Sequence, residues 1–121
     1  MNTIEASIAQ YNEAWSAKET EAIKATLKDC WTAESTYTDP QTDLLKGFEG
    51  LAAHISGFHK HFIGGKIQQA SKADCHHHSG RFKWILTQAD GVKIEGMDYF
   101  EFNDQNQIIR IVGFFGPFTN L

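Results

Sequence analysis

The feature that most constrains the fold is a change in hydrophobic spacing at Gly64–Gly65. Before these glycines, apolar residues recur at helical spacing, as Ile8, Tyr11 and Trp15 do. After them, apolar and polar residues alternate, which is typical of strands with one buried face. The chain is therefore predicted to begin with helices and to end in a sheet.

The spacing and the turn signals together predict the order of the elements. The predicted helices cover residues 4–17, 20–30 and 48–62, and a strand at 34–39 and a polar loop at 41–47 lie between the second and the third. Long strands are predicted at 66–77, 81–89, 92–103 and 107–117, with turns at Ser79–Gly80, Asp90–Gly91 and 104–107. This order indicates one α+β domain over residues 1–121, in which a curved antiparallel or mixed sheet wraps around the helices and leaves a cone.

Length, charge and cysteine content limit the class of protein. A chain of 121 residues is long enough for one hydrophobic core. A net charge of −4 without a run of Lys or Arg argues against nucleic-acid binding. The absence of a leader-like segment and of an apolar run of about 18 residues predicts a cytoplasmic protein without membrane contact. Cys30 and Cys75 have no metal or redox spacing, so we expect buried thiols in a reducing compartment.

The strand at 34–39 ends in Asp39–Pro40, where proline stops the ladder of hydrogen bonds. Tyr37 and Asp39 are two residues apart and therefore point to the same face of the strand. If that face looks into the cone, the fold holds a carboxylate inside an apolar chamber. The alternative is that Asp39 only caps its own turn, as Asp before Pro often does.

A second carboxylate, Asp98, lies on the predicted strand 92–103 and shares a face with Gly96 and Phe100. Burial raises a carboxyl pKa, and a neighbouring negative charge raises it further. If Asp39 and Asp98 faced one apolar cavity, their pKa values would be pushed apart, and the pair could supply an acid and a base at neutral pH. The alternative for Asp98 is a structural pairing with a buried Arg, His or Trp N–H.

The histidine run 76–78 is the most unusual local feature. His76 and His78 share a strand face, a spacing known in zinc sites, and Asp74 or a histidine of the helix 48–62 could add a ligand. The run could also lie exposed beside the turn. We predict no metal and retain His78 as a proton donor lining the cavity, because it shares parity with the apolar face of the next strand.

Several aromatic residues are predicted to form the cavity wall, although the same residues could simply fill a core. They are Trp15, Tyr37, Trp84, Phe100 and Phe115. Trp31 is expected to pack a helix against the sheet. His54, His59 and His61 are expected on the exposed or dimer-facing sides of their helix.

The element order, the Asp39–Pro40 pair and the segments 96–102 and 108–115 resemble the nuclear-transport-factor-2-like superfold, which is also described as cystatin-like, and its SnoaL-like polyketide-cyclase and ketosteroid-isomerase branch. In ketosteroid isomerase, the Asp of a similar Asp-Pro pair is the general base, so the resemblance implies that role for Asp39. It also implies a protonated carboxyl donor at Asp98 and a tyrosine donor on the first helix. Tyr11 is the best match for that tyrosine, and Trp15 competes for the position.

The resemblance implies an isomerase, cyclase or dehydratase that works by acid–base chemistry without a cofactor. Its substrate would be a small apolar or aromatic carbonyl compound. The superfold also hosts non-catalytic binders and dimerising interaction modules, and these remain the alternatives. A homodimer is expected through the outer sheet face, because apolar residues there need cover. Those residues are Ile85, Tyr99, Val112 and Phe114.

Overall fold

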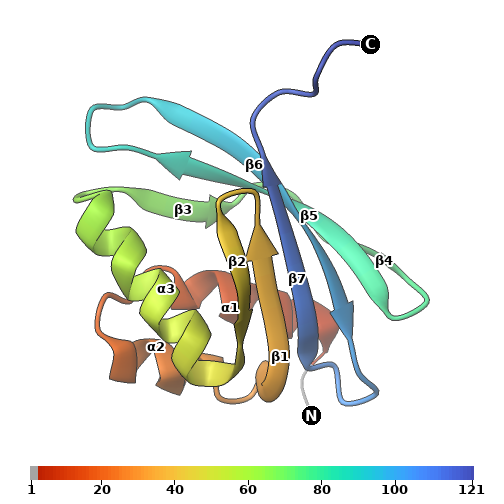
Figure 1. The fold of residues 1–121 in the computed structure, drawn as a ribbon. Coiled ribbons are helices and arrows are strands. Elements are labelled where there is room, and N and C mark those ends of the chain that lie inside the picture. Colours follow the sequence, from red (N-terminus) through yellow and green to blue (C-terminus); the bar gives the residue numbers. More distant parts are fainter. Residues whose placement is uncertain (1–2) are drawn as a thin grey trace.

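The computed structural model describes residues 3–121. Its helices are α1 (Ile4–Ala14), α2 (Thr20–Leu27) and α3 (Gly47–His61). Its strands are β1 (Trp31–Asp39), β2 (Thr42–Lys46), β3 (Lys66–Gln69), β4 (Asp74–His76), β5 (Ser79–Thr87), β6 (Lys93–Phe102) and β7 (Ile108–Phe115). Figure 1 shows the helices gathered beside one mixed sheet.

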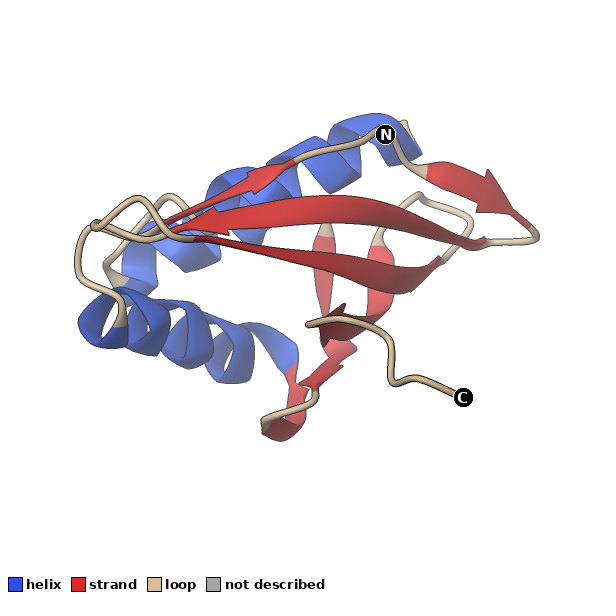
Figure 2. Cartoon of the chain, turned by 90° about the horizontal axis from the view of Figure 1, so that it is seen from above, coloured by secondary structure: helices blue, strands red, loops and turns tan. Residues whose placement is uncertain are grey.

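The strands form one sheet in the order β2-β1-β7-β6-β5-β3, and β4 pairs with β5 beyond the end of β3. β1 and β7 are parallel, whereas the other pairs are antiparallel. The sheet bends so strongly that Figure 2 shows some strands lengthwise and others nearly end-on. This arrangement confirms the predicted α+β cone.

Side chains from α1 and from the inner face of the sheet close the narrow end of the cone. Tyr11 stacks on Trp31 with 6.2 Å between ring centroids, and its ring also meets Phe82 at 6.5 Å. Phe100 is fully buried, and its ring lies 5.9 Å from that of Phe82. Burying aromatic rings of this size contributes a large share of the hydrophobic stabilisation of a small domain.

The start of α1 agrees with the sequence, since the Thr3 hydroxyl accepts a hydrogen bond from the Ala6 amide at 3.1 Å. The prediction of a loop at 41–47 was wrong, because residues 42–46 form β2, which pairs with β1. The strand predicted at 34–39 begins earlier, at Trp31, whose indole N–H donates to the Gly47 carbonyl at 3.0 Å.

The predicted strand 66–77 is divided into β3 and β4, and the expected turn is shifted by two residues. Ser79–Gly80 lies within β5, while His77 and His78 form a two-residue hairpin loop with positive φ angles of 50° and 59°. Cys30 is buried, and burial raises the pKa of its thiol to about 12. Cys75 is exposed, contrary to prediction. No helix within residues 3–121 is long and apolar enough to cross a membrane.

Candidate active site

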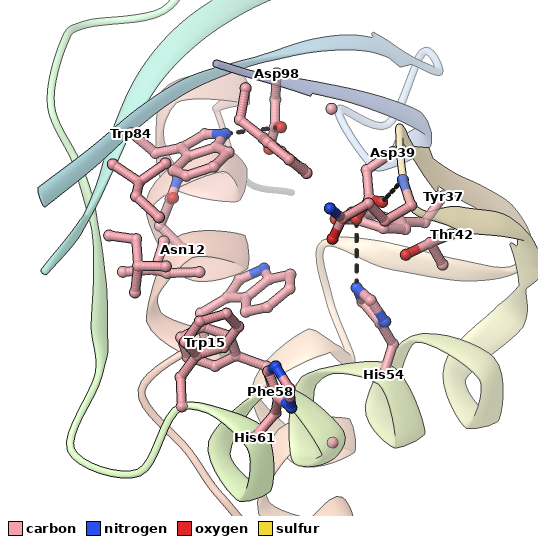
Figure 3. Close-up of a pocket in the computed structure, with 18 of the residues that line it drawn as sticks. Asn12, Trp15, Tyr37, Asp39, Thr42, His54, Phe58, His61, Trp84 and Asp98 are labelled. Carbon is pink, nitrogen blue, oxygen red and sulfur yellow. Dashed lines mark hydrogen bonds and ion pairs between the residues drawn. The ribbon is translucent and has the colours of Figure 1, made fainter. Parts of the chain in front are cut away.

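A cavity of about 560 Å³ occupies the wide part of the cone, between α1, α3 and the inner face of the sheet. Aromatic side chains make much of its wall, and Asp39 and Asp98 are its carboxylates. Among the described residues, no Lys or Arg lines it. The aromatic residues are Tyr11, Trp15, Tyr37, Phe58, Phe62, Trp84 and Phe115. Figure 3 shows Asp98 with Trp84 on one side of the cavity and Asp39 with Tyr37 on the other.

Asp39 is held at the end of β1 by its own strand and by the turn that follows. The Tyr37 hydroxyl donates to Asp39 Oδ2 at 2.7 Å, as expected for neighbours on one strand face. The Gln41 amide donates to Asp39 Oδ1 at 2.9 Å, so Asp39 also caps its turn. Its side chain keeps 10% of its surface exposed. Burial raises the pKa of Tyr37 far above its usual range, so Tyr37 remains a donor.

Asp98 lies on β6, directly opposite Phe82 of β5, and is almost completely buried. The Trp84 indole N–H donates to Asp98 Oδ1 at 3.0 Å. Burial raises the pKa of Asp98 to about 7, although the Trp84 hydrogen bond opposes this and the Asp39 charge adds to it. The structural pairing with a Trp N–H therefore exists, and it occupies only one of the two carboxyl oxygens.

Gly113 of β7 separates the two carboxylates. Asp98 pairs with Gly113 across β6 and β7, and Asp39 follows Thr38, which pairs with Val112 across β1 and β7. With about 4.8 Å between adjacent strands, the two aspartate backbones lie about 10 Å apart. A Cβ at Gly113 would lie 3.1 Å from Asp98 Oδ1 and 3.3 Å from Asp39 Cβ. The glycine thus leaves room for both side chains on one face of the sheet.

Tyr11 of α1 is one of the residues that line the cavity. Its hydroxyl is buried and has no hydrogen-bond partner among the described residues. Burial raises the pKa of Tyr11 well above its usual value, Asp98 raises it further, and the nearby Trp15 indole opposes the shift. A buried, unpaired hydroxyl is uncommon in folded proteins.

His54 of α3 also lines the cavity, which corrects the prediction that it faces outward. Its Nε2 lies 3.6 Å from Asp39 Oδ2. Its ring meets those of Trp15 and Tyr37 at centroid distances of 5.7 and 5.0 Å. One feature of the sequence indicates this position of His54. It lies four residues before Phe58, so it shares a helix face with that residue, next to the most apolar face of the helix. His61 lines the cavity as well.

Two predicted site residues lie elsewhere. His78 is exposed on the β4–β5 turn, where its Nε2 bonds Asp104 Oδ1 at 3.0 Å, because the hairpin loop resets the strand register. Phe100 lies in the core rather than in the cavity wall, because Gly80 on β5 leaves space for its ring. His59 Nε2 lies 2.6 Å from the Trp15 carbonyl oxygen.

Trp15, Tyr37, Trp84 and Phe115 line the cavity as expected, together with Tyr11 and the two aspartates. Within residues 3–121, no three His, Cys, Asp or Glu side chains come close enough together to hold a metal ion.

Comparison with known proteins identifies the fold through similarity of structure rather than through similarity of sequence. No protein-family model and no curated protein matches the chain. Among solved structures, a candidate isomerase of the SnoaL-like family from Agrobacterium tumefaciens strain C58 is similar, with a TM-score of 0.83 and 29% sequence identity. This match covers 96% of the present chain and 100% of the other.

More distant structures share the fold at lower identity. A protein from Catenulispora acidiphila with a ketosteroid-isomerase-like fold, solved in complex with trimethylamine, matches with a TM-score of 0.73 and 11% identity over 88% of this chain and 82% of that one. An NTF2-like protein of unknown function from Exiguobacterium sp. 255-15 matches with a TM-score of 0.72 and 13% identity, over 93% of this chain and 99% of that one. By these likenesses, the chain has the fold of nuclear-transport-factor-2-like proteins, which SnoaL-like and ketosteroid-isomerase-like structures share.

Proposed function

We propose that the chain is a cofactor-independent isomerase or cyclase, which moves a proton next to the carbonyl group of a small, largely apolar substrate. The observation that carries this proposal is that Asp39 and Asp98 face one aromatic cavity from clearly different surroundings. Asp39 accepts hydrogen bonds on both oxygens. Asp98 is buried, with a pKa of about 7. Two carboxyl groups that differ in this way suit a base and an acid.

The surroundings assign a role to each group. Asp39, which accepts the Tyr37 and Gln41 hydrogen bonds, acts as the ionised general base. Asp98 has a raised pKa and one oxygen already bonded to Trp84, so its other oxygen carries a proton and donates a hydrogen bond to the substrate carbonyl. The unpaired Tyr11 hydroxyl is the second donor to the same oxygen.

The reaction follows from these roles. The base removes a proton from the carbon beside the carbonyl, and the electron pair of that C–H bond forms an enolate. Asp98 and Tyr11 stabilise the negative oxygen, which costs less in a cavity where donors are already in place. Return of the proton to a different carbon completes an isomerisation, and attack of the enolate on a second carbonyl carbon would complete a cyclisation.

The test uses cyclohex-3-en-1-one, a small ketone whose conversion to the conjugated isomer is followed by ultraviolet absorbance. Asp39→Asn should lower kcat/KM at least about a hundredfold, the usual size of a general-base effect. The matched control is Asp43→Asn, since Asp43 is exposed on β2 and outside the cavity lining. Equal activity of the Asp39→Asn variant and the wild type would overturn the assignment of the base.

A second candidate function is non-catalytic binding of an organic ammonium compound. The faces of the aromatic rings and the charge of the aspartates would attract a cation. Among the described residues, no Lys or Arg lines the cavity to oppose this attraction. The fold relative solved with trimethylamine supports this class of ligand. Calorimetric titration with benzyltrimethylammonium should show binding that Asp39→Asn weakens about tenfold, because the substitution removes a charge. Binding unchanged by Asp39→Asn would contradict this candidate.

A further inference from the structure

Beside the proposed base, the cavity holds a second group that can carry a proton. His54 Nε2 of α3 faces Asp39 Oδ2 of β1 at 3.6 Å, and Figure 3 marks the pair. The Trp15 ring meets the imidazole edge-on, at an interplanar angle of 90°, and the Tyr37 ring lies against it. These contacts, from Trp15 just after α1 and from Tyr37 of β1, hold the imidazole toward the carboxylate.

The imidazole is suited to receive a proton. Burial lowers the pKa of His54 below its usual value even though the Asp39 charge opposes this, so the ring is neutral at pH 7. The separation of 3.6 Å between Nε2 and Oδ2 is slightly longer than a hydrogen bond, so a small movement brings the two atoms into hydrogen-bond contact. Contacts between catalytic groups often tighten when substrate binds.

The difference in exposure gives the proton a path out. The Asp39 side chain is 10% exposed, whereas that of His54 is 25% exposed. Asp39 and Tyr37 are the titratable groups of β1 that face the imidazole, and Tyr37 already donates to Asp39. His54 is therefore the neighbour through which a proton on Asp39 can reach water.

We propose that His54 is a proton relay between Asp39 and solvent; this rests on the isomerase function proposed above. The substrate C–H bond breaks, its electron pair forms the enolate, and the proton goes to the Asp39 carboxylate. The proton then passes from the Asp39 O–H to Nε2 of the neutral His54 ring, which lies 3.6 Å from Asp39 Oδ2 and is the more exposed of the two side chains. The imidazolium exchanges its proton with water, and a solvent proton returns through Asp39 to the γ-carbon of the enolate.

The test is isomerisation of unlabelled cyclohex-3-en-1-one in D₂O, with deuterium at the γ-carbon of the product measured by NMR and mass spectrometry. In the wild-type protein the relay should place solvent deuterium at that carbon. In His54→Gln, Asp39 should return the same hydrogen that it removed, so the fraction of retained hydrogen should rise about twofold or more. The fraction of retained hydrogen is measured in the product already formed, so a slower overall turnover of the variant does not by itself change it.

The matched control is His77→Gln, since His77 lies on the exposed β4–β5 turn. It should give the wild-type deuterium content. His54→Phe, which keeps a flat ring against Trp15 and Tyr37, serves as a second variant if His54→Gln does not fold. Isomerisation with equal deuterium in the wild type and either folded variant overturns the relay alone. A wild-type protein without isomerase activity overturns the proposed function and the relay together.

Discussion

Asp98 shows how one buried side chain can link chemistry to stability. Its carboxyl is surrounded by the sheet and by Trp84, so folding favours the neutral form and raises the pKa from 3.8 to about 7. The folded state therefore binds this proton more tightly than the unfolded chain does. The resulting stabilisation is fully present below about pH 4 and is lost as the pH rises to about 7.

We predict that Asp98→Asn makes the protein more stable than the wild type at pH 8 and that this difference shrinks toward pH 4. Asn keeps the shape and a hydrogen-bond acceptor for Trp84, but it has no charge to bury. A shift of about three pKa units sets an upper limit of about 4 kcal/mol at pH 8. Urea denaturation at several pH values measures this, with Asp43→Asn as the exposed control. A difference that does not change with pH would contradict the raised pKa.

The same group predicts the pH dependence of the proposed reaction. The protonated form of Asp98 is the donor, so kcat/KM should fall as the pH rises above about 7. In Asp98→Asn the side-chain amide donates at every pH, and the alkaline fall should disappear. A pH–rate profile of both proteins with the cyclohexenone probe measures the effect. An alkaline fall that persists in the Asp98→Asn variant would assign it to another group.

At the scale of the elements, the pairing of β5 with β6 positions Trp84. Trp84 lies directly opposite Gly96, and its indole covers the glycine backbone. A Cβ at Gly96 would lie 2.1 Å from Trp84 Cζ2, too close for both to stay. The absence of a side chain on β6 therefore sets the indole where its N–H reaches Asp98.

We predict opposite effects for two glycine-to-alanine substitutions. Gly96→Ala should lower the free energy of unfolding by about 1–3 kcal/mol, because it overfills the inner face of the sheet. Gly57→Ala, on α3 with open space around its Cα, should raise it by about 0.5–1 kcal/mol through helix propensity. Urea denaturation followed by circular dichroism measures both. Near-UV spectra should change only for Gly96→Ala, and equal stability of the two variants would contradict this packing.

The sequence predicted those parts of the site that depend on local parity. Tyr37 and Asp39 share a face because they are two residues apart on a strand, and the alternation along 92–103 placed Asp98 on an inner face. His54 was missed because its helix has two adjacent inward faces, one toward the core and one toward the cavity. Only the tertiary packing of α3 decides between them. His78 was misplaced because His77 and His78 adopt positive φ angles, which few non-glycine residues do.

At the scale of the whole molecule, the outer face of the sheet is the surface at which we expect a second copy of the chain to bind. The side chains that alternate with the cavity wall point outward from β5, β6 and β7, and several of them are apolar. They are Ile85, Met97, Tyr99, Val112 and Phe114. Phe114 keeps 52% of its surface exposed. A patch of this kind on a regular sheet favours a symmetric contact with a second copy, because the same patch then covers itself.

We predict that the chain is a homodimer through this face. Light scattering after size exclusion, at micromolar concentration, should give a mass near twice the 13.6 kDa of one chain. Phe114→Glu should give a mass near 13.6 kDa, because it would place two charges at a dry contact. The matched control is Leu44→Glu on β2, a residue 62% exposed and outside the patch, which should remain dimeric. A wild-type monomer, or a Phe114→Glu variant that still dimerises, would place the contact elsewhere or remove it.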